Sequence, residues 1–395
     1  MQYDTAFFDK PIDRLGTACA KWDGLWKNEG EGLLPMWVAD MDLRCAREIT
    51  DALRARAEHP VYGYTYQTDG AVDAMLGYMK RRQGVTLTRD EQATVPCVIT
   101  GLKAAVLALT QPGDSVLIQP PVYGPFFSSV TANERTVVKN PLFRDADGRY
   151  QIDFGQLETQ LKAGVKLMMI CNPHNPVGRA WSRRELEQTY ALCKRYGAAL
   201  IADEIHSGFV YEKGAFTSAL LLDEAKDASI AVLTSATKTF NIAGLRQAVL
   251  LTRNQAIKTA LTEYMDRIGA LGVNIFALEA TEAAYRYGGA WLDGLLEYLD
   301  AARAIVKREL QTRLPEAALS PIEATYMGWI DLRAYGLTGD ELTEATHAEG
   351  VALTNGTFFD SELGEGFLRI NFACPHSQTL KALELLERAI KKHER

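Results

Sequence analysis

The chain has 395 residues, which is enough for one very large domain or two ordinary ones at about 150 residues per domain. Hydrophobic residues make up 47% and charged residues 24%, both close to globular averages, so the composition argues against a disordered, collagen-like or coiled-coil protein. The formal net charge is −7 and no run of Lys and Arg stands out, so we expect neither nucleic acid nor an anionic membrane as a partner.

Targeting and metal-binding patterns do not stand out either. No apolar run approaches the roughly 18 residues needed to span a bilayer, and the first residues do not resemble a secretory signal, so we expect a cytoplasmic protein without a membrane span. The six cysteines form no Cys-x-x-Cys pair and the six histidines show no ligand spacing, which predicts neither a disulfide framework nor a metal site. Dinucleotide, Walker A and zinc-protease motifs do not occur.

The first 45 residues contain Trp22, Trp26 and Trp37 among glycines, which is typical of an irregular arm that covers another surface. Beyond the arm, short apolar runs alternate with longer periodic ones, which predicts alternating strands and helices. The helix expected over 182–196 has a capping box from Ser182 to Glu185 and ends at Gly197. The other elements expected here are a helix over 102–110 and buried strands over 115–119, 166–171, 198–203 and 230–235.

The C-terminal part has a different pattern. A long helix is expected over 291–314, followed by an alternating strand, a helix, a second strand and a last helix, over 326–332, 340–349, 367–372 and from 377. Together these patterns predict an α/β protein with a mostly parallel, doubly wound sheet in a large domain and a smaller α+β domain. We place the arm, with part of the small domain, at 1–45, the large domain at 46–287 and the small domain at 288–395.

Polar residues follow three of the expected strands. Asn175 lies in a proline-rich loop, Asp203 and His206 end a small apolar strand, and Lys238 lies in a hydroxyl-rich turn. Taken alone, Asp203 could cap a helix and Lys238 could be a surface lysine. In a doubly wound sheet, however, ligands bind beyond the carboxyl ends of the strands, where these residues would meet. An arginine and hydroxyls suit a phosphate, a carboxylate suits a ring nitrogen and a lysine suits an aldehyde, which together describe pyridoxal phosphate.

One competing motif occurs at the same place. Ser235 and Lys238 match the Ser-x-x-Lys motif of penicillin-binding proteins and class A β-lactamases, in which the serine is the nucleophile. The supporting Ser-Asp-Asn and Lys-Thr-Gly triplets are missing from this chain, so the pyridoxal phosphate interpretation is favoured.

The chain resembles the pyridoxal phosphate-dependent enzymes of fold type I and, within them, the cystathionine β-lyase or cysteine-sulfur lyase group. The Asp-Glu-Ile-His string at 203–206 and the Lys-Thr-Phe-Asn string at 238–241 are typical of this subgroup. Further strings that carry the resemblance lie at 21–23, 35–42, 63–65, 121–123, 172–179 and 369–375.

The resemblance implies a role for each matching residue. Lys238 resembles the lysine that bonds to the cofactor and removes the Cα proton, and we expect the neighbouring Arg246 and the cofactor ring to lower the pKa of its amine. Asp203 resembles the carboxylate that pairs with the pyridine nitrogen, and Tyr123 the tyrosine that stacks on the ring. Lys238, Asp203 and Tyr123 are therefore the expected catalytic residues. Asn175 would donate to the ring 3-oxygen, with His206 close behind it or, equally, buried as an ordinary core residue.

The phosphate and the substrate complete the expected site. The resemblance implies that the phosphate is held by Ser235, Thr237, Arg246 and the backbone amides of Val98 and Ile99, with Tyr64 reaching it from the other subunit of a homodimer. The substrate would be a small amino acid, bound through its carboxylate by Arg369, with Val38 and Asn175 alongside. The sequence departs from the family at Cys97, where glycine is usual, and over 355–359, where a Phe-Gly string is usual.

The implied reaction is β-elimination from cystathionine, cysteine or a related S-substituted cysteine, giving a thiol, pyruvate and ammonia. An aminotransferase is the main alternative, because transamination uses the same cofactor residues. A regulator that binds a transcription factor is a second alternative, and it could coexist with catalysis.

Overall fold

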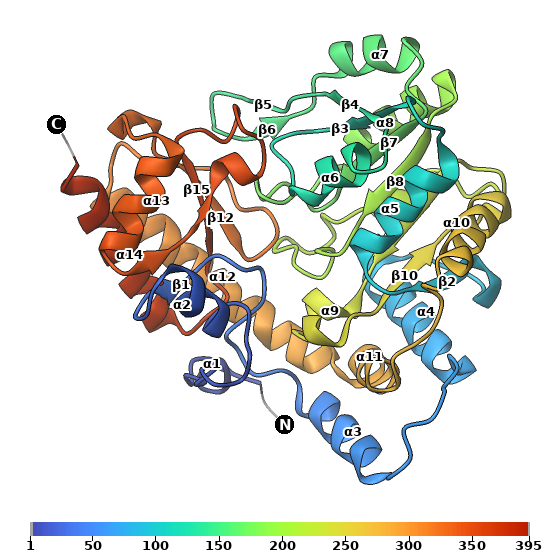
Figure 1. Ribbon diagram of the computed structural model, residues 1–395, viewed down its shortest axis with the longest axis horizontal. Coiled ribbons are helices and arrows are strands. Elements are labelled where there is room, and N and C mark those ends of the chain that lie inside the picture. The colour runs from blue at the N-terminus through green and yellow to red at the C-terminus, as the bar shows by residue number, and fades with distance from the viewer. Residues whose placement is uncertain (1–2, 394–395) are drawn as a thin grey trace.

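The computed structural model describes residues 3–393 and contains a seven-stranded sheet with the strand order β2-β10-β9-β8-β7-β3-β4 (Figure 1). Strand β10 is antiparallel to both of its neighbours, whereas β9, β8, β7, β3 and β4 run parallel to one another. The predicted α/β class with a mostly parallel sheet is therefore confirmed. The strands are β2 (Gln92–Val95), β3 (Ser115–Ile118), β4 (Thr136–Lys139), β7 (Leu167–Cys171), β8 (Ala199–Asp203), β9 (Ile230–Thr234) and β10 (Ala248–Leu251).

Helices cover both faces of this sheet, which explains why its central strands are apolar throughout. In β7, Met168 and Ile170 pack into one hydrophobic cluster with α4, α7, α8 and α11, whereas Leu167 and Met169 pack into a second with α5, α6 and α10. The helices of this part are α3 (Arg47–Glu58), α4 (Asp69–Gln83), α5 (Val98–Leu109), α6 (Pro125–Thr131), α7 (Phe154–Lys162), α8 (Arg183–Tyr196), α9 (Ala236–Thr239), α10 (Gln255–Arg267) and α11 (Ile275–Tyr287).

Two of these helices test the sequence analysis directly. For α8 the prediction is confirmed, because Ser182 accepts a hydrogen bond from the backbone N–H of Glu185 and Gly197 adopts a left-handed conformation. For α5 the predicted start at Leu102 is wrong, because the helix begins at Val98. Gly101 lies inside this helix, where a Cβ atom would come within 2.5 Å of Leu233, so the glycine permits close packing of helix on sheet.

The C-terminal part forms a four-stranded antiparallel sheet with the order β11-β12-β15-β14, packed with three helices. The arm contributes to this part, because β1 (Leu34–Pro35) pairs with β13 (Val351–Ala352). The arm is also less irregular than expected, since it contains α1 (Thr5–Phe8) and α2 (Asp23–Glu29). The remaining elements are α12 (Gly289–Arg313), β11 (Ala318–Leu319), β12 (Met327–Asp331), α13 (Gly339–Ala348), β14 (Thr354–Asn355), β15 (Phe367–Asn371) and α14 (His376–Lys391).

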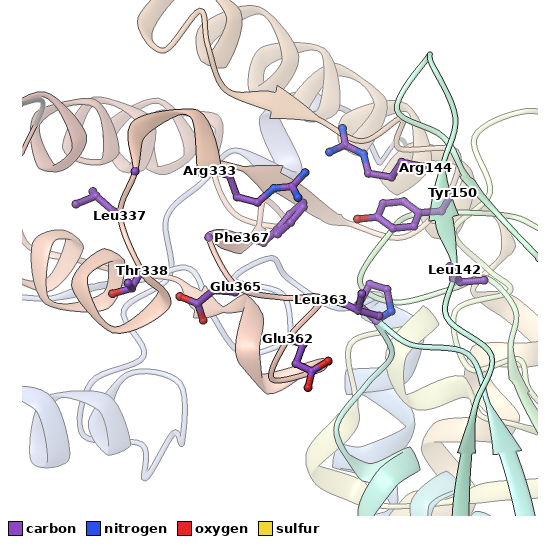
Figure 2. A pocket seen from close by; sticks show the side chains of 13 residues that line it. Leu142, Arg144, Tyr150, Arg333, Leu337, Thr338, Glu362, Leu363, Glu365 and Phe367 are labelled. Carbon is purple, nitrogen blue, oxygen red and sulfur yellow. The ribbon is translucent and has the colours of Figure 1, made fainter.

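Charged and aromatic contacts join the two parts. Arg144 forms an ion pair with Asp331 at 2.5 Å, and the indole of Trp329 donates to the hydroxyl of Tyr150 at 3.0 Å. Beside these contacts lies a cavity of about 480 Å³, lined by Arg144 and Tyr150 from one part and by Phe367 from the other (Figure 2). Over residues 3–393, none of the helices combines the length and the apolar character needed to cross a bilayer.

Candidate active site

A cavity of about 410 Å³ lies at the carboxyl ends of β7, β8 and β9, and the arm and the C-terminal part close its sides. Cys171 and Asp203 reach it from the last residues of β7 and β8, and Lys238 reaches it from α9, which follows β9. Most of the expected site residues line this one cavity: Val38, Val98, Ile99, Tyr123, Asn175, Asp203, His206, Thr237, Lys238, Arg246 and Arg369.

Lys238 projects from α9 into the cavity, where its ammonium group donates a hydrogen bond to the backbone oxygen of Ala39. Burial lowers the pKa of this amine to about 8; Asp40 opposes the shift, and Arg369 adds to it. Removal from water is the main cause of the shift and Arg369 is an arginine that contributes to it, whereas the expected effects of Arg246 and of the cofactor ring stay predictions. A larger neutral fraction near pH 7 prepares the amine to attack an aldehyde.

Asp203 is a buried carboxylate at the floor of the cavity. One of its oxygens accepts a hydrogen bond from the backbone N–H of Ile205 at 3.0 Å, and burial raises its pKa to about 7 although the charge of Lys238 opposes this shift. A protonated ring nitrogen placed against this carboxylate would supply the missing positive charge and return the pKa toward its ordinary value.

His206 and Asn175 lie beside this carboxylate in the lining. His206 is buried, and its Nδ1 atom has no hydrogen-bond partner among residues 3–393. Burial lowers its pKa to about 3, with Lys238 and Arg369 contributing, so the imidazole is neutral at physiological pH. An unsatisfied ring nitrogen at a cavity wall is suited to a bound polar group.

The phosphate end of the expected site is open to an anion. Helix α5 begins at the cavity with Val98 and Ile99, and the thiol of the preceding Cys97 contacts the hydroxyl of Thr100 at 3.2 Å but caps no backbone amide of the helix. The free amides of such a helix start attract anions. Arg246 lies nearby in a left-handed conformation with φ of 52°, and its guanidinium has no partner within the described part of the chain. Cys97 itself has φ of −164°, an extended conformation that does not require glycine.

Ser235 does not line this cavity. Its hydroxyl donates to the backbone oxygen of Gln247 at 2.5 Å and accepts from the backbone N–H of Thr237 at 3.0 Å. The residue is buried and borders a separate small pocket next to Gln247. The structure therefore gives Ser235 the role of a helix cap, an arrangement that supports neither the serine-nucleophile alternative nor a direct opening toward the expected phosphate.

Arg369 extends from β15 and is buried among neutral groups. Its Nη1 donates to the side-chain oxygen of Asn175 at 3.1 Å, and its Nη2 donates to the backbone oxygen of Trp37 at 2.5 Å and to the hydroxyl of Thr354 at 3.1 Å. Burial lowers its pKa to about 10, and its Nε atom is without a partner in the described chain. A buried guanidinium surrounded by neutral acceptors is suited to a carboxylate ligand.

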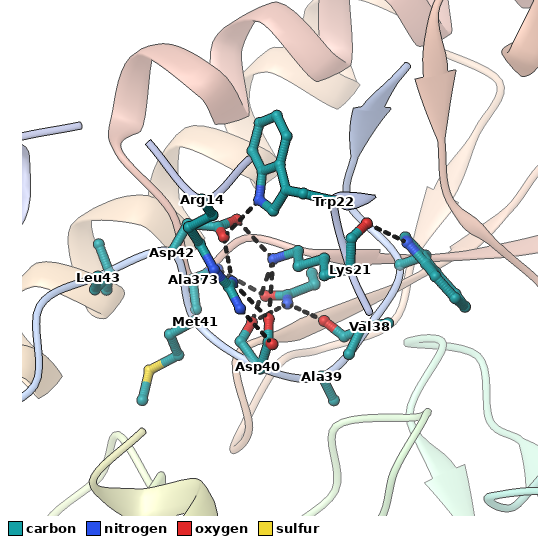
Figure 3. Close-up of polar contacts among 12 residues, drawn as sticks. Arg14, Lys21, Trp22, Val38, Ala39, Asp40, Met41, Asp42, Leu43 and Ala373 are labelled. Carbon is teal, nitrogen blue, oxygen red and sulfur yellow. Dashed lines mark hydrogen bonds and ion pairs between the residues drawn. The ribbon is translucent and has the colours of Figure 1, made fainter. Parts of the chain in front are cut away.

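A network of charged residues fixes the arm at the cavity edge (Figure 3). The fully buried Lys21 donates to Asp42 at 2.7 Å, and Arg14 forms ion pairs with both Asp40 and Asp42. Burial alone would raise the pKa of Asp42, but Lys21 and the hydrogen bonds lower it overall. Asn371 donates to the backbone oxygens on either side of Ala39, so the backbone that accepts from Lys238 is held in place.

Tyr64 does not line the cavity of its own chain. It is fully exposed on the segment between α3 and α4, together with the exposed side chains of Val61, Tyr62 and Tyr66. Tyr62 contacts Phe276 at 5.7 Å between ring centroids, whereas Tyr64 has no ring contact among the described residues.

The lining also contains residues that the sequence analysis did not assign to the site, among them Trp37, Thr354 and Phe358. Trp37 lies within the arm string that carried the resemblance, and Phe358 lies within the segment where the chain departs from the family, so position along the chain held a signal in both cases. Thr354 carried no such signal, because its role depends on the contact with Arg369.

Comparison with known proteins shows which family has this fold and site. The model of the family "Aminotransferase class I and II" matches residues 39–386. Cystathionine beta-lyase PatB of Bacillus subtilis is 40% identical over 97% of this chain and 99% of its own length, and protein MalY of Escherichia coli is 33% identical over 97% and 98%. The crystal structure of cystalysin from Treponema denticola, which contains a pyridoxal 5'-phosphate cofactor, superposes with a TM-score of 0.94 at 32% identity over 99% of this chain and all of that one.

The residues of the cavity fit the same cofactor: a low-pKa lysine, a buried carboxylate, an unpartnered imidazole nitrogen and a free helix start lie around one space. The resemblance found in the sequence is thereby confirmed. The chain belongs to the aminotransferase class I and II family, the pyridoxal phosphate-dependent enzymes of fold type I, in the branch that contains the cystathionine β-lyases and C–S lyases.

Proposed function

We propose that this protein is a carbon–sulfur β-lyase that cleaves the Cβ–S bond of cystathionine, cysteine or a related S-substituted cysteine and releases a thiol, pyruvate and ammonia. The observation that carries the proposal is the cavity in which Lys238, Asp203 and Arg369 meet, in a chain that is 40% identical to a cystathionine beta-lyase over almost its whole length. One water molecule is consumed for each substrate cleaved, which balances the atoms.

Bound pyridoxal phosphate would supply the electron-withdrawing ring that stabilises the carbanion at Cα. Lys238 would hold the cofactor through its amine and then move the proton at Cα, which a neutral amine can accept. Asp203 would keep the ring nitrogen protonated, because an ionised carboxylate stabilises the adjacent positive charge. Tyr123, whose pKa is raised by burial, would stay neutral and cover one face of the ring.

Substrate orientation would depend on Arg369 and Asn175. The Nε atom of Arg369 has no partner among residues 3–393 and its Nη1 atom uses one of two N–H groups for Asn175, so two donors remain for the two oxygens of an α-carboxylate. Asn175 holds the guanidinium through the 3.1 Å hydrogen bond. Val38 lies on the arm beside this pair and limits the space around the Cα atom. Thr237, Arg246 and the amides of Val98 and Ile99 would hold the phosphate.

A homodimer belongs to the same proposal. The exposed side chains of Val61, Tyr62, Tyr64 and Tyr66 form an apolar surface of the kind that mediates association. Tyr64 would reach the phosphate of the partner subunit from this surface, so that each active site is shared. Sedimentation should show a dimer, and Tyr64→Ala should weaken cofactor binding without removing Lys238 chemistry.

The decisive experiment is to incubate the purified holoenzyme with cystathionine and measure thiol and pyruvate together, with the Lys238→Ala variant as the control. Equal amounts of thiol and pyruvate without an added keto acid support the lyase. Retained turnover in Lys238→Ala would contradict the role of this lysine.

An aminotransferase is the second candidate, favoured by the family model that matches residues 39–386. It requires an acceptor keto acid, transfers the amino group stoichiometrically and releases no thiol. The same assay, with an acceptor keto acid added in a parallel sample, separates the two reactions.

A further inference from the structure

Phe358 is an aromatic side chain placed at the mouth of the active-site cavity. It is the last residue of the short 3₁₀ helix η5 (Gly356–Phe358), and it lines the cavity while remaining 50% exposed. Its ring centroid lies 5.9 Å from that of Tyr123, the residue proposed to cover the cofactor ring. The mouth therefore has an aromatic wall that continues outward from the proposed reaction centre.

The backbone that presents this ring is fixed. A Cβ atom on Gly356 would lie 2.2 Å from the backbone oxygen of Gly364, so the two ends of the loop are in close contact. Asp360 forms an ion pair with Lys139 of the large sheet, at a distance of 2.7 Å. The far end of the same loop lines the second cavity through Leu363 (Figure 2), so the loop runs between two cavities while remaining attached to both parts of the chain.

The ring of Phe358 also packs in a defined position. A Cβ atom on Gly124 would come within 3.1 Å of the Cζ atom of Phe358 and 3.0 Å of its backbone oxygen. The absence of a side chain at Gly124 therefore lets the ring pack on the backbone, and the adjacent Phe359 contacts it edge-on at 5.2 Å. A side chain held in this way loses little conformational entropy when a ligand packs against it.

The distribution of charge around the cavity limits what can bind next to Phe358. The charged side chains in its lining are Asp203, Lys238, Arg246 and Arg369, and each has a proposed role toward the cofactor or the α-carboxylate. His206 is neutral because burial lowers its pKa to about 3. No charged group of the described lining remains for the far end of a substrate.

The position of Arg369 directs that far end toward the aromatic wall. The guanidinium lies over the ring of Phe359 at 5.0 Å, next to Phe358 in the chain, and Trp37 accepts from it on the arm side. Within one chain, Trp37, Tyr123 and Phe358 are the aromatic lining residues available to the sulfur substituent of a substrate whose carboxylate is held by Arg369.

We propose that Phe358 is a specificity-determining residue and that the preferred substrates are cysteines with a neutral, apolar sulfur substituent, an inference that rests on the proposed lyase function. Binding is stabilised when an alkyl or benzyl group leaves water and packs against the aromatic wall. The second amino-acid head group of cystathionine would instead lose hydration without gaining a charged partner.

The test measures pyruvate release by the holoenzyme from S-benzylcysteine, cystathionine and cysteine, for the wild type and the variants Phe358→Ala, Phe358→Leu and Phe143→Ala. Phe143 is the matched control, because it is 51% exposed and lies outside the cavity lining. We expect the wild type to prefer S-benzylcysteine to cystathionine in kcat/KM. Phe358→Ala should lower the kcat/KM ratio of S-benzylcysteine to cysteine about 10-fold, the scale of a lost apolar pocket contact. Phe358→Leu should have a smaller effect and Phe143→Ala none.

A second readout does not depend on turnover. 3-Phenylpropanoate carries a carboxylate and an apolar ring but no amine, and its binding can be followed through tryptophan fluorescence because Trp37 lines the cavity. Its Kd should rise about 10-fold in Phe358→Ala. Three results would each overturn the specificity proposal while leaving the lyase intact. Phe358→Ala could lower kcat/KM equally for all three amino acids, it could leave the Kd of 3-phenylpropanoate unchanged, or the wild type could prefer cystathionine. If the wild type releases pyruvate from none of the three, the proposed function fails as well.

Discussion

Asn175 and Arg369 lie 194 positions apart in the chain, yet the guanidinium of Arg369 donates a 3.1 Å hydrogen bond to the side-chain oxygen of Asn175. Asn175 follows β7 of the large sheet and Arg369 belongs to β15 of the C-terminal sheet. This bond therefore joins the two parts of the chain at the cavity. It also fixes the plane of the guanidinium proposed to hold the substrate.

The first prediction concerns Arg369→Lys. A lysine keeps the charge but cannot present two parallel N–H groups, so the substrate carboxylate loses one charge-assisted hydrogen bond, worth about 1.5–3 kcal/mol. We expect kcat/KM for pyruvate release to fall roughly 10- to 100-fold, mainly through KM. Arg183→Lys, in an exposed ion pair with Glu187 on α8, is the control and should leave both constants unchanged.

The second prediction concerns the pH dependence of cofactor attachment to Lys238. Burial lowers the pKa of this amine from 10.5 to about 8, so the reactive neutral fraction rises about tenfold per pH unit below pH 8 and levels off above it. Mixing the apoenzyme with pyridoxal phosphate at pH 6 to 9.5 and following absorbance should give a rate with this shape. A rate that keeps rising past pH 9 would show an ordinary lysine and contradict the prediction.

The third prediction concerns Glu204, which is fully buried and accepts hydrogen bonds from the Ser218 hydroxyl and the Ala219 backbone N–H, both at 2.7 Å. Burial raises its pKa to about 8, so the folded state holds this proton more tightly than the unfolded state does. Its contribution to stability is complete below about pH 4.5 and is lost as the pH rises through 8.

Glu204→Gln replaces the acid by a neutral amide that can keep both contacts. Its melting temperature relative to the wild type should therefore increase between pH 6 and pH 9, as measured by calorimetry. Glu187→Gln at an exposed position is the control and should show no such trend. A constant difference between Glu204→Gln and the wild type at all pH values would mean that Glu204 is already ionised at pH 6.

The fourth prediction concerns Lys21→Met in the arm network. The substitution keeps the length of the side chain but removes a fully buried cation, which leaves the buried Asp42 with Arg14 and the indole of Trp22. Breaking a buried pair in this way should cost about 3 kcal/mol of unfolding free energy. Adding Asp42→Asn should recover part of the loss, because the buried carboxylate that has lost one of its two cationic partners is then replaced by a neutral amide.

The control for this variant is Lys27→Met on α2, where the side chain is exposed, and its effect should stay within about 0.5 kcal/mol. Denaturant unfolding measures both free energies. If the two lysine variants are equally stable, the network does not hold the arm.

The sequence alone determined the α/β class, the positions of the central strands and the residues that follow them. Asp203 and Lys238 could be found this way because Asp203 ends a short apolar strand and Lys238 lies in the turn of helix just after another. The carboxyl ends of neighbouring parallel strands meet at one edge of the sheet, so these residues come close together in space. The division of the chain at residues 45 and 287 stays a prediction.

Only the tertiary structure decided which groups share the cavity. Ser235 is only two positions from Thr237, yet its hydroxyl donates to the backbone oxygen of Gln247 and does not line the cavity. Arg369, 131 positions from Lys238, contributes to the lowered pKa of that lysine. Phe358 reaches the cavity because a distant glycine, Gly124, leaves space for its ring. Hydrogen-bond competition, burial and close packing depend on residues that are far apart in the chain, and no local pattern records them.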